Sequence, residues 1–280
     1  MPTYIQSHPG HEPLPQAKSG KSAMDVARRA ALAAGDVLVQ RYSHAKTVKW
    51  KGKSNITTDA DIAAEEAIVR IIEAEYPTHN IVAEESGKSE QQSEYSWLVD
   101  PLDGTNNFLF GIPFFAVTIG LTAGDQVLLG VTYDPMRREM FHGEVDSPSR
   151  LNGEEIFASK RTNLRDALIG FDVGYKPEKG LQVLEFAPEL WRQAHGVRLM
   201  GSAALGLAYV ASGRLDVYCH RCLYPWDIAA GLLIVRNSGG LVTDWDGTRA
   251  TPKTDQIIAA GKSIHSTFRD WHASWERSKS

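Results

Sequence analysis

The sequence predicts a single α/β domain. In some stretches apolar residues recur at spacings of three and four, which is typical of a helix with one packed face. In others they form short apolar or alternating runs bounded by Gly, Pro and Asp, which are typical of strands. The 280 residues, 42% hydrophobic and 23% charged, have the length and composition of an ordinary globular protein.

The N-terminal 22 residues differ from the rest of the chain because they show no apolar period. They are rich in Pro, Gly, His and Ser, which predicts a disordered or loosely attached tail at 1–22 and a folded domain at 23–280. Gly20-Lys21-Ser22 matches the end of a phosphate-binding P-loop, but Pro15 stands where that motif requires glycine. The tail also lacks the apolar centre of a secretory signal peptide.

Charge and cysteine content exclude several classes of partner. The formal net charge is −4 and the pI is about 6.1, so the basic footprint of a nucleic-acid-binding protein is absent. No apolar run reaches the length of a membrane span. Two cysteines without an export signal predict a cytoplasmic protein, and the expected partner is a small molecule.

The first hundred residues are predicted to alternate helices with short strands. Ala27, Ala31, Ala34 and Leu38 mark the packed stripe of the first helix. In chain order the expected elements are a helix over 24–42, a basic loop over 46–54, a strand over 55–58, a helix that begins at Asp59 or Asp61, and a strand over 80–83 that ends at Glu84.

The remainder of the chain is predicted to contain strands first and then mixed elements. Asn152-Gly153 is a hairpin turn signal, and Phe268, Trp271 and Trp275 mark the face by which a C-terminal helix packs on the core. The expected strands are 114–121, 127–133, 139–142, 168–173, 197–200, 214–219, 241–243 and 257–260, and the expected helices are 181–193, 203–211 and 226–235.

An acidic stretch after residue 96 is the centre of the functional prediction. Trp97–Val99 is typical of a short buried strand that ends at Asp100, because Pro101 cannot continue a central ladder. Asp103 follows within reach of the same point, and Gly104 permits close approach of a ligand. Residues 105–108 then resemble the first turn of a helix, whose free N–H groups suit a phosphate. Carboxylates beside an anion site favour Mg²⁺ and a phosphate ester, although such a string is by itself also an ordinary polar turn.

Four motifs in this order resemble the inositol monophosphatase family of Mg²⁺-dependent, lithium-sensitive phosphatases. They are Thr57-Thr58-Asp59-Ala60-Asp61, Ala83-Glu84-Glu85-Ser86, the stretch from Trp97 to Phe108, and Tyr224-Pro225-Trp226-Asp227-Ile228-Ala229-Ala230-Gly231 with Asn237-Ser238-Gly239-Gly240. The resemblance runs from about residue 24 to the C-terminus. It implies a layered α/β sandwich of the sugar-phosphatase type, with two mixed sheets between helix layers, and a homodimer.

The resemblance also implies roles for individual residues. Asp61 and Thr105 would activate and orient the attacking water. Two or three Mg²⁺ ions would be held by Glu84, Asp100, the Leu102 carbonyl, Asp103 and Asp227. The substrate would be contacted by Glu84, Leu102, Asp103, Gly104, Thr105, Gly201, Ser202, Ala203, His220 and Asp227. Four carboxylates that converge without cations raise one another's pKa values, which is the physical reason to expect more than one divalent ion.

Several of these residues have structural interpretations that compete with the functional ones. An acidic residue at a helix start is favoured by capping alone, so capping is expected for Asp59 and function for Asp61. Glu84 could be an ordinary surface residue, but the end of its strand is expected to share a sheet edge with Asp100. Ser202 would be a common helix cap if it did not meet a ligand.

The substrate is the least determined part of the prediction. His220 stands seven residues before Asp227, at a position where the inositol-specific members carry Glu. An imidazole can bind a hydroxyl but also an acidic group, so histidinol phosphate is the nearest alternative to an inositol monophosphate. Fructose 1,6-bisphosphate and nucleotide 3′-phosphates are further alternatives. The non-enzymatic alternative is a protein-binding role in a transcription complex.

Cys219 and Cys222 form a Cys-x-x-Cys pair beside His220. One such pair provides too few ligands for a structural zinc site. Residues three apart on a strand face opposite sides, so a disulfide between these two would be strained. Ordinary thiols are expected, and a redox switch beside the substrate pocket is the alternative.

Overall fold

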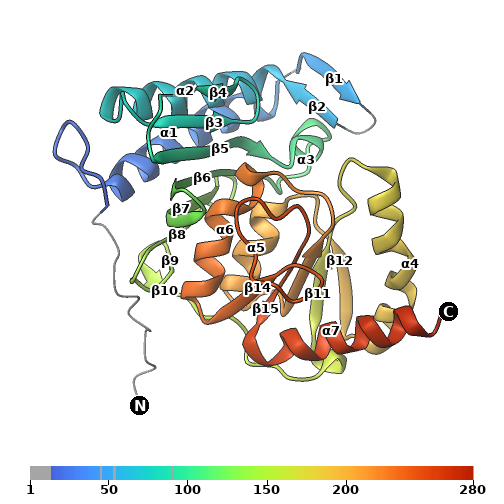
Figure 1. The fold of residues 1–280 in the computed structure, drawn as a ribbon. Helices are drawn as coiled ribbons and strands as arrows, with labels where there is room; N and C mark the ends of the chain where they lie inside the picture. The colour runs from blue at the N-terminus through green and yellow to red at the C-terminus, as the bar shows by residue number, and fades with distance from the viewer. Residues whose placement is uncertain (1–13, 45, 53–54, 90, 280) are drawn as a thin grey trace.

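Helices and sheets alternate in five layers in the computed structural model, which describes residues 14–44, 46–52, 55–89 and 91–279 (Figure 1). Helices α1 (Ala23–Tyr42) and α2 (Asp59–Glu75) cover one face of an eight-stranded sheet. Helices α5 (Ala203–Ala211) and α6 (Pro225–Asn237) fill the space between this sheet and a five-stranded sheet. The outermost layer, on the far face of the second sheet, is completed by α4 (Pro177–Gln193) and α7 (Lys262–Arg277).

Both large sheets are mixed, as predicted. In the first, β3 and β5 are parallel and the other neighbours are antiparallel, in the order β10-β9-β8-β7-β6-β5-β3-β4. Its strands are β3 (Asn80–Ala83), β4 (Gly87–Ser89), β5 (Tyr95–Asp103), β6 (Ala116–Ala123), β7 (Gln126–Asp134), β8 (Glu139–Glu144), β9 (Arg150–Leu151) and β10 (Glu154–Glu155).

In the second sheet β11 runs parallel to both of its neighbours, and the other pairs are antiparallel, in the order β12-β11-β13-β15-β14. Its strands are β11 (Leu168–Phe171), β12 (Gly196–Leu199), β13 (Val217–His220), β14 (Gly240–Thr243) and β15 (Ile257–Gly261). The smaller elements are β1 (Val48–Gly52), β2 (Asn55–Thr58), α3 (Thr105–Leu109) and the 3₁₀ turn η1 (Leu164–Asp166).

The close approach of α6 to the first sheet depends on glycine. A Cβ on Gly120 would lie 2.9 Å from the Ala229 side chain, and one on Gly130 would lie 2.6 Å from the Ala230 backbone. Since β6 and β7 carry these glycines, the helix that bears Asp227 can pack directly on the strands. Sheet glycines and helix alanines therefore set the distance between Asp227 and the rest of the site.

Most predicted elements are present, including the C-terminal helix. Phe268 is fully buried, and Trp271 and Trp275 pack against the same core cluster. The hairpin turn at Asn152-Gly153 joins β9 to β10. Among the described residues, no helix is both long and apolar enough to span a membrane.

Two local predictions about strands were wrong. The expected basic loop at 46–54 contains β1, which pairs with β2 as an antiparallel hairpin. The expected short strand that ends at Asp100 is longer, because β5 continues past Pro101 to Asp103. The register shifts between Asp100 and Asp103, so the proline lies where the ladder is interrupted.

Part of the predicted tail also differs from expectation. Residues 1–13 lie outside the described residues, but 14–22 pack against the end of α2. The Lys18 and Ser19 N–H groups donate to the Glu75 backbone and side chain at 3.0 and 3.1 Å. The Tyr76 hydroxyl donates to the Pro15 carbonyl at 3.0 Å, and Ala17 is buried. Loose attachment therefore does not describe this segment.

Candidate active site

The interrupted end of β5 brings the acidic stretch into a compact turn. Asp100 and Leu102 are buried, and Asp100 Oδ1 accepts a hydrogen bond from the Leu102 N–H at 2.9 Å. Gly104 follows with a φ of 98°, and a Cβ there would lie 3.0 Å from the Gly201 carbonyl oxygen. Only glycine fits both restrictions, so α3 begins immediately after a turn that approaches α5 closely.

Thr105 and Asp61 are joined across two elements. The Thr105 hydroxyl lies 3.0 Å from Asp61 Oδ1 and 3.0 Å from the Leu102 carbonyl oxygen, so its single hydrogen is shared between two acceptors. Burial raises the pKa of Asp61 to about 6, although hydrogen bonds from Thr58 oppose that shift. The arrangement is a hydroxyl backed by a carboxylate that is ionised near neutral pH.

Asp61 also has the structural role that was expected of Asp59. Thr58 is the N-cap of α2, and its N–H donates to Asp61 Oδ2 at 2.8 Å in a capping box. Asp59 instead accepts the Thr47 N–H at 3.0 Å and pairs with Arg41. The prediction of capping by Asp59 was therefore wrong, because the residue at the third helical position, not the first, can reach back to the N-cap.

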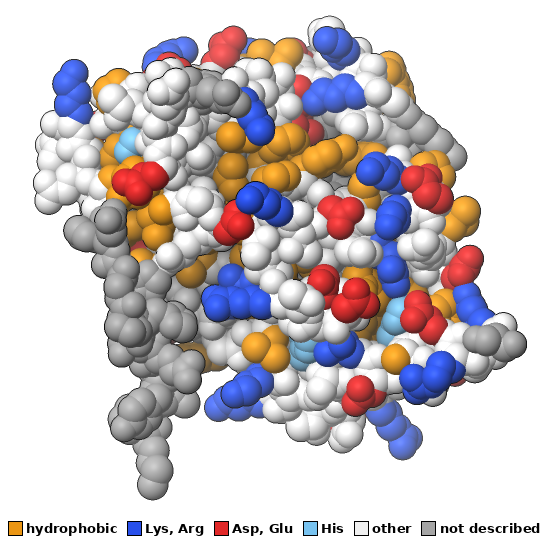
Figure 2. All heavy atoms as spheres, in the orientation of Figure 1, with side chains coloured by type: hydrophobic (Ala, Val, Ile, Leu, Met, Phe, Trp, Pro, Cys, Tyr) orange, Lys and Arg blue, Asp and Glu red, His pale blue; other side chains and the backbone are white. Residues whose placement is uncertain are grey.

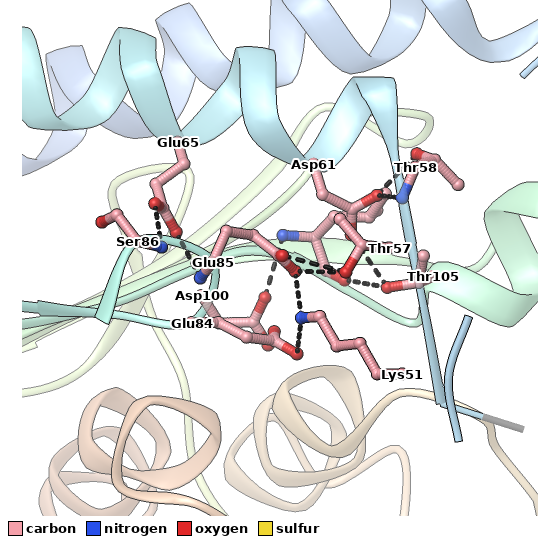
Figure 3. A network of polar contacts seen from close by, with 11 residues as sticks. Lys51, Thr57, Thr58, Asp61, Glu65, Glu84, Glu85, Ser86, Asp100 and Thr105 are labelled. Carbon is pink, nitrogen blue, oxygen red and sulfur yellow. Dashed lines mark hydrogen bonds and ion pairs between the residues drawn. The ribbon is translucent and has the colours of Figure 1, made fainter. Parts of the chain in front are cut away.

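Glu84 lies beside Asp100 because their strands are parallel neighbours. Its N–H donates to the Val99 carbonyl at 3.1 Å, directly after β3 ends. The Lys51 ammonium, on β1, lies 3.8 Å from Glu84 and 2.8 Å from Glu85 (Figure 3). Burial raises the pKa of Glu84 to about 8, and Lys51 only partly opposes it.

Glu85 and Lys51 are neighbours of the site for which no firm role was predicted. Glu85 accepts a hydrogen bond from the Thr57 hydroxyl at 2.9 Å, in addition to its ion pair with Lys51 (Figure 3). The Glu65 carboxylate fixes the backbone here by accepting the Glu85 and Ser86 N–H groups, each at 2.8 Å. The hairpin β1–β2 is thereby linked to the end of β3.

Asp103, the last residue of β5, contacts the start of α5. Asp103 accepts hydrogen bonds from the Ser202 hydroxyl and from the Ala203 and Ala204 N–H groups, the last two at 3.3 and 2.8 Å. Burial raises the pKa of Asp103 to about 6 in spite of these donors. The predicted substrate-contact turn that contains Gly201, Ser202 and Ala203 therefore lies against Asp103.

Asp227 completes the group of carboxylates from the opposite layer. It is the third residue of α6 and accepts the Tyr224 N–H at 2.7 Å. Burial raises its pKa, and the charges of Glu84 and Asp103 raise it further. The pKa of Asp100 is also raised, first by burial and then by Glu84, Asp103 and Asp227. The four predicted metal ligands are therefore close enough to repel one another.

The oxygen atoms of these four carboxylates suit Mg²⁺, but in their present orientation they do not converge on one point as the ligands of an ion would. Among the described residues, no three His, Cys, Asp or Glu side chains are arranged to hold an ion. Each carboxylate is instead turned toward a donor of its own, namely Lys51, Leu102 N–H, the start of α5 or Tyr224 N–H. An all-oxygen set of buried, mutually repelling carboxylates suits a hard divalent cation once the side chains turn toward it.

Among the described residues, the His220 ring makes no hydrogen bond or ion pair with the four carboxylates. Within the described part of the chain, the only hydrogen bond of its ring is from the Cys222 N–H to Nδ1, at 2.9 Å. Burial lowers the pKa of His220 to about 3, so the ring is neutral and its proton is on Nε2. Cys219 and Cys222 are buried free thiols.

Tyr175 is a neighbour of the carboxylates that was not predicted. Burial raises the pKa of its phenol, and the charges of Glu84, Asp227, Asp103 and Asp100 raise it further. Tyr175 lies in the loop after β11, between that strand and α4. The rule that loops at strand ends line the site, which located Glu84, could have identified this loop as well.

The surface agrees with the composition. Lys and Arg side chains are interspersed with Asp and Glu on the face drawn in Figure 2, without a broad area of one sign. This face therefore offers no extended basic surface of the kind that tracks a nucleic-acid backbone.

Comparisons with known proteins agree with the fold and the motifs. The model of the inositol monophosphatase family matches residues 21–275. The chain is 37% identical over 246 residues to a protein named Nus factor SuhB from Haemophilus influenzae, covering 86% of this chain and 92% of that protein. It is 38% identical over 247 residues to a protein named inositol-1-monophosphatase from Synechocystis, covering 86% and 85% of the two chains.

Solved structures give the same result. The extragenic suppressor protein suhB from Bartonella henselae superposes with a TM-score of 0.84 at 36% identity, covering 88% of this chain and 96% of that one. An inositol monophosphatase from Anabaena superposes with a TM-score of 0.78 at 37% identity, with coverage of 88% and 93%. These matches, together with the motifs at the ends of β3 and β5 and at the start of α6, identify the chain as a member of the inositol monophosphatase family.

Proposed function

We propose that this protein uses Mg²⁺ to hydrolyse a small phosphate monoester, and that its substrate is of the inositol monophosphate type. The observation that carries the proposal is the group of four carboxylates, of which Asp100 is buried and Glu84, Asp103 and Asp227 are partly buried, beside the Thr105–Asp61 pair. A cluster of this kind is costly without cations, because each carboxylate raises the pKa of its neighbours. Family membership supports the same chemistry.

The carboxylates and one backbone carbonyl would provide the ligands of two cations. Glu84, Asp100 and the Leu102 carbonyl would hold one Mg²⁺, and Asp100, Asp103 and Asp227 would hold another. Bound Mg²⁺ supplies positive charge for the ester oxygens and makes a bound water more acidic.

Thr105 and Asp61 provide the path for the proton. The Thr105 oxygen can accept a hydrogen from the attacking water while its own hydrogen passes to Asp61, 3.0 Å away. Asp61 can accept it above about pH 6, where it is ionised. The water oxygen then bonds to phosphorus as the ester P–O bond breaks; the leaving oxygen takes a proton from solvent and Asp61 returns its proton to solvent, so the products are inorganic phosphate and an alcohol. Positioning and charge stabilisation dominate such a reaction.

The alcohol part of the substrate would face the turn at Gly201–Ala203 and the His220 ring. A neutral imidazole with a proton on Nε2 is a hydrogen-bond donor, so it suits a hydroxyl or an anionic acceptor. Histidinol phosphate is therefore the main alternative substrate, followed by fructose 1,6-bisphosphate and nucleotide 3′-phosphates.

Phosphate release across a substrate panel tests the proposal. The panel holds inositol 1-phosphate, histidinol phosphate, fructose 1,6-bisphosphate and adenosine 3′,5′-bisphosphate, each with and without Mg²⁺ and with lithium as inhibitor. We expect Asp103→Asn to lower kcat/KM by about 100-fold or more, as loss of a group that stabilises charge typically does. Asp125→Asn is the matched control, because Asp125 is an exposed surface carboxylate paired with Lys253. Equal activity of the two variants would refute the metal site.

A protein-binding role is the second candidate, favoured by the relatives named Nus factor SuhB. It predicts that the purified chain binds a reconstituted transcription complex, and that Asp103→Asn binds equally well because hydrolysis is not needed. If neither protein binds, this candidate is rejected.

Light scattering of the same samples tests the homodimer that the family resemblance implies.

A further inference from the structure

The turn between β12 and α5 is held from two sides by groups outside it. Asp172 Oδ1 accepts hydrogen bonds from the Met200 N–H at 2.9 Å and from the Gly201 N–H at 2.6 Å. On the other side, Asn107 Nδ2 donates one hydrogen to the Phe114 carbonyl at 2.8 Å and shares the other between the Met200 and Gly201 carbonyls, each at 3.2 Å. The N–H groups of the turn are thus bound by one side chain and its carbonyls by another.

Asp172 is built into the sheet. It directly follows β11, its side chain is buried, and its second oxygen accepts the Tyr218 hydroxyl at 2.7 Å from the neighbouring strand β13. No ion pair of the described residues includes Asp172. Three hydrogen bonds therefore compensate the charge, and burial raises the pKa of Asp172 to about 7.

The geometry of the turn leaves it little freedom. Gly201 has a φ of 76°, and a Cβ there would lie 2.7 to 3.1 Å from the Asn107 side chain. The next residue, Ser202, is the N-cap of α5 and donates its hydroxyl hydrogen to Asp103. Any displacement of the turn would therefore move the start of α5 relative to Asp103.

We propose that Asp172 is a positioning residue for substrate binding, which holds the Met200–Ser202 turn so that Gly201, Ser202 and Ala203 face the alcohol part of the substrate. Asn107 secures the opposite side of the same turn. Asp172 itself contacts neither substrate nor metal. This inference rests on the proposed function for its kinetic consequence, whereas the hold on the turn is independent of any activity.

Three variants test the proposal. Asp172→Ala removes the acceptor of both N–H groups. Asp172→Asn keeps an oxygen for them and an amide that can bond to Tyr218, so it should largely restore function. The matched control is Asp216→Ala, which removes another buried carboxylate of the same sheet; Asp216 directly precedes β13, accepts the Leu168 N–H at 2.7 Å at the start of β11, and pairs with Arg161.

Kinetics on the preferred ester should separate positioning from stability. We expect Asp172→Ala to raise KM about tenfold with a smaller change in kcat, because contacts made equally in the ground state and transition state appear in KM. Asp172→Asn should stay within about threefold of the wild-type KM. Asp216→Ala should lower the melting temperature without changing KM. An unchanged KM in Asp172→Ala, or an equal rise in Asp216→Ala, would overturn the proposal.

Amide hydrogen exchange at Met200 and Gly201 gives a readout that does not need catalysis. Exchange should be about tenfold faster in Asp172→Ala than in wild type and in Asp216→Ala. It should be about threefold faster in Asp172→Asn, since a hydrogen bond to a charged acceptor is stronger than one to a neutral acceptor. If the wild type hydrolyses no ester, the proposed function fails, yet these rates still decide the role of Asp172. If exchange at Met200 and Gly201 is unchanged in both Asp172 variants, the positioning role of Asp172 is refuted. If Asp172→Ala does not fold, unchanged exchange in Asp172→Asn refutes it in the same way.

Discussion

The Thr105–Asp61 pair shows how one side chain serves the fold and the chemistry at once. Asp61 Oδ2 accepts the Thr58 N–H at the start of α2, while Oδ1 accepts the Thr105 hydroxyl. The capping bonds fix the rotamer of Asp61, because the carboxylate is held in place by its own helix. The helix start therefore aims the oxygen that Thr105 needs.

Substitutions of this pair should be non-additive. We expect Thr105→Val and Asp61→Asn each to lower kcat by about 100-fold or more, in the range of general acid–base catalysis. The double variant should be no slower than the worse single variant, because both changes break one proton path. Thr105→Ser keeps the hydroxyl and should keep most of the activity. Additive losses in steady-state kinetics would mean that the two residues act separately.

The acidic residues around Asp100 and the resemblance of four motifs to a known family predicted which carboxylates lie together, but not their surroundings. Asp100 and Asp103 could be predicted because Pro101 indicates an interruption of the strand ladder and Gly104 follows the end of the strand. Asp172 could not be recognised as important from its neighbours in sequence. Its significance arises from the N–H groups of Met200 and Gly201, 28 and 29 residues away, which only the parallel β11–β12 pairing brings together.

At the scale of elements, the packing of α6 on the first sheet controls where Asp227 lies. Gly130 on β7 faces the Ala230 backbone, and a Cβ at Gly130 would be only 2.6 Å from Ala230 Cα and 2.7 Å from its carbonyl oxygen. Backbone atoms cannot move aside as a flexible side chain can. Any side chain at this position must therefore push the whole helix outward, together with the carboxylate at its start.

Gly130→Ala should be strongly destabilising for its size. Overpacking of this kind typically lowers the free energy of unfolding by about 1–3 kcal/mol. Gly52→Ala is the control, because a Cβ at Gly52 would meet no atom within 4 Å and its φ is not positive, and we expect a change within about 0.5 kcal/mol. Urea unfolding measures both values. Equal stability of the two variants would show that α6 does not depend on this contact.

Element types were predicted correctly where the apolar period was strong. They were missed where a short segment is a strand because it pairs with a neighbouring strand. The stripe from Ala27 to Leu38 defined α1 without help from other elements. The segment that became β1 alternates Val48 and Trp50 with Lys49 and Lys51, which is a strand pattern, but it is short, basic and mostly exposed, and the prediction of a solvated loop overlooked the alternation. It is a strand because β2 pairs with it, and such cross-strand pairing is not encoded in either segment alone.

Across the whole molecule, buried acid is the dominant electrostatic feature. Burial raises the pKa of Glu84 to about 8, of Asp172 to about 7, and of Asp61 and Asp103 to about 6. The fold class and the presence of the acidic cluster could be predicted from the sequence. The free-energy cost of burying these carboxylates could not be predicted, because it depends on how five layers exclude water from residues that are far apart in the chain.

This cost predicts an unusual dependence of stability on pH in the absence of divalent ions. A carboxylate whose pKa is higher in the folded than in the unfolded state binds its proton more tightly when folded, so its contribution to stability is lost as the pH rises through the folded pKa. For Glu84 this loss extends from the ordinary pKa of 4.5 up to about pH 8, and for Asp172 from 3.8 up to about pH 7. Burial lowers the pKa of His220 and His272 to about 3 and 4, so both are neutral when folded, and they oppose the trend only until the unfolded histidines have lost their protons, at about pH 7.

Melting temperatures measured in EDTA should therefore fall as the pH is raised from 6.5 to 8. Added Mg²⁺ should raise the melting temperature more at pH 8 than at pH 6.5, because a cation stabilises the ionised carboxylates and must compete with protons for the others. In Asp103→Asn the Mg²⁺-dependent rise should shrink at both values, whereas Asp125→Asn should behave as wild type. If stability in EDTA instead rises toward pH 8, ionisation of the carboxylates does not destabilise the folded protein. The electrostatic case for a divalent-cation site would then be lost.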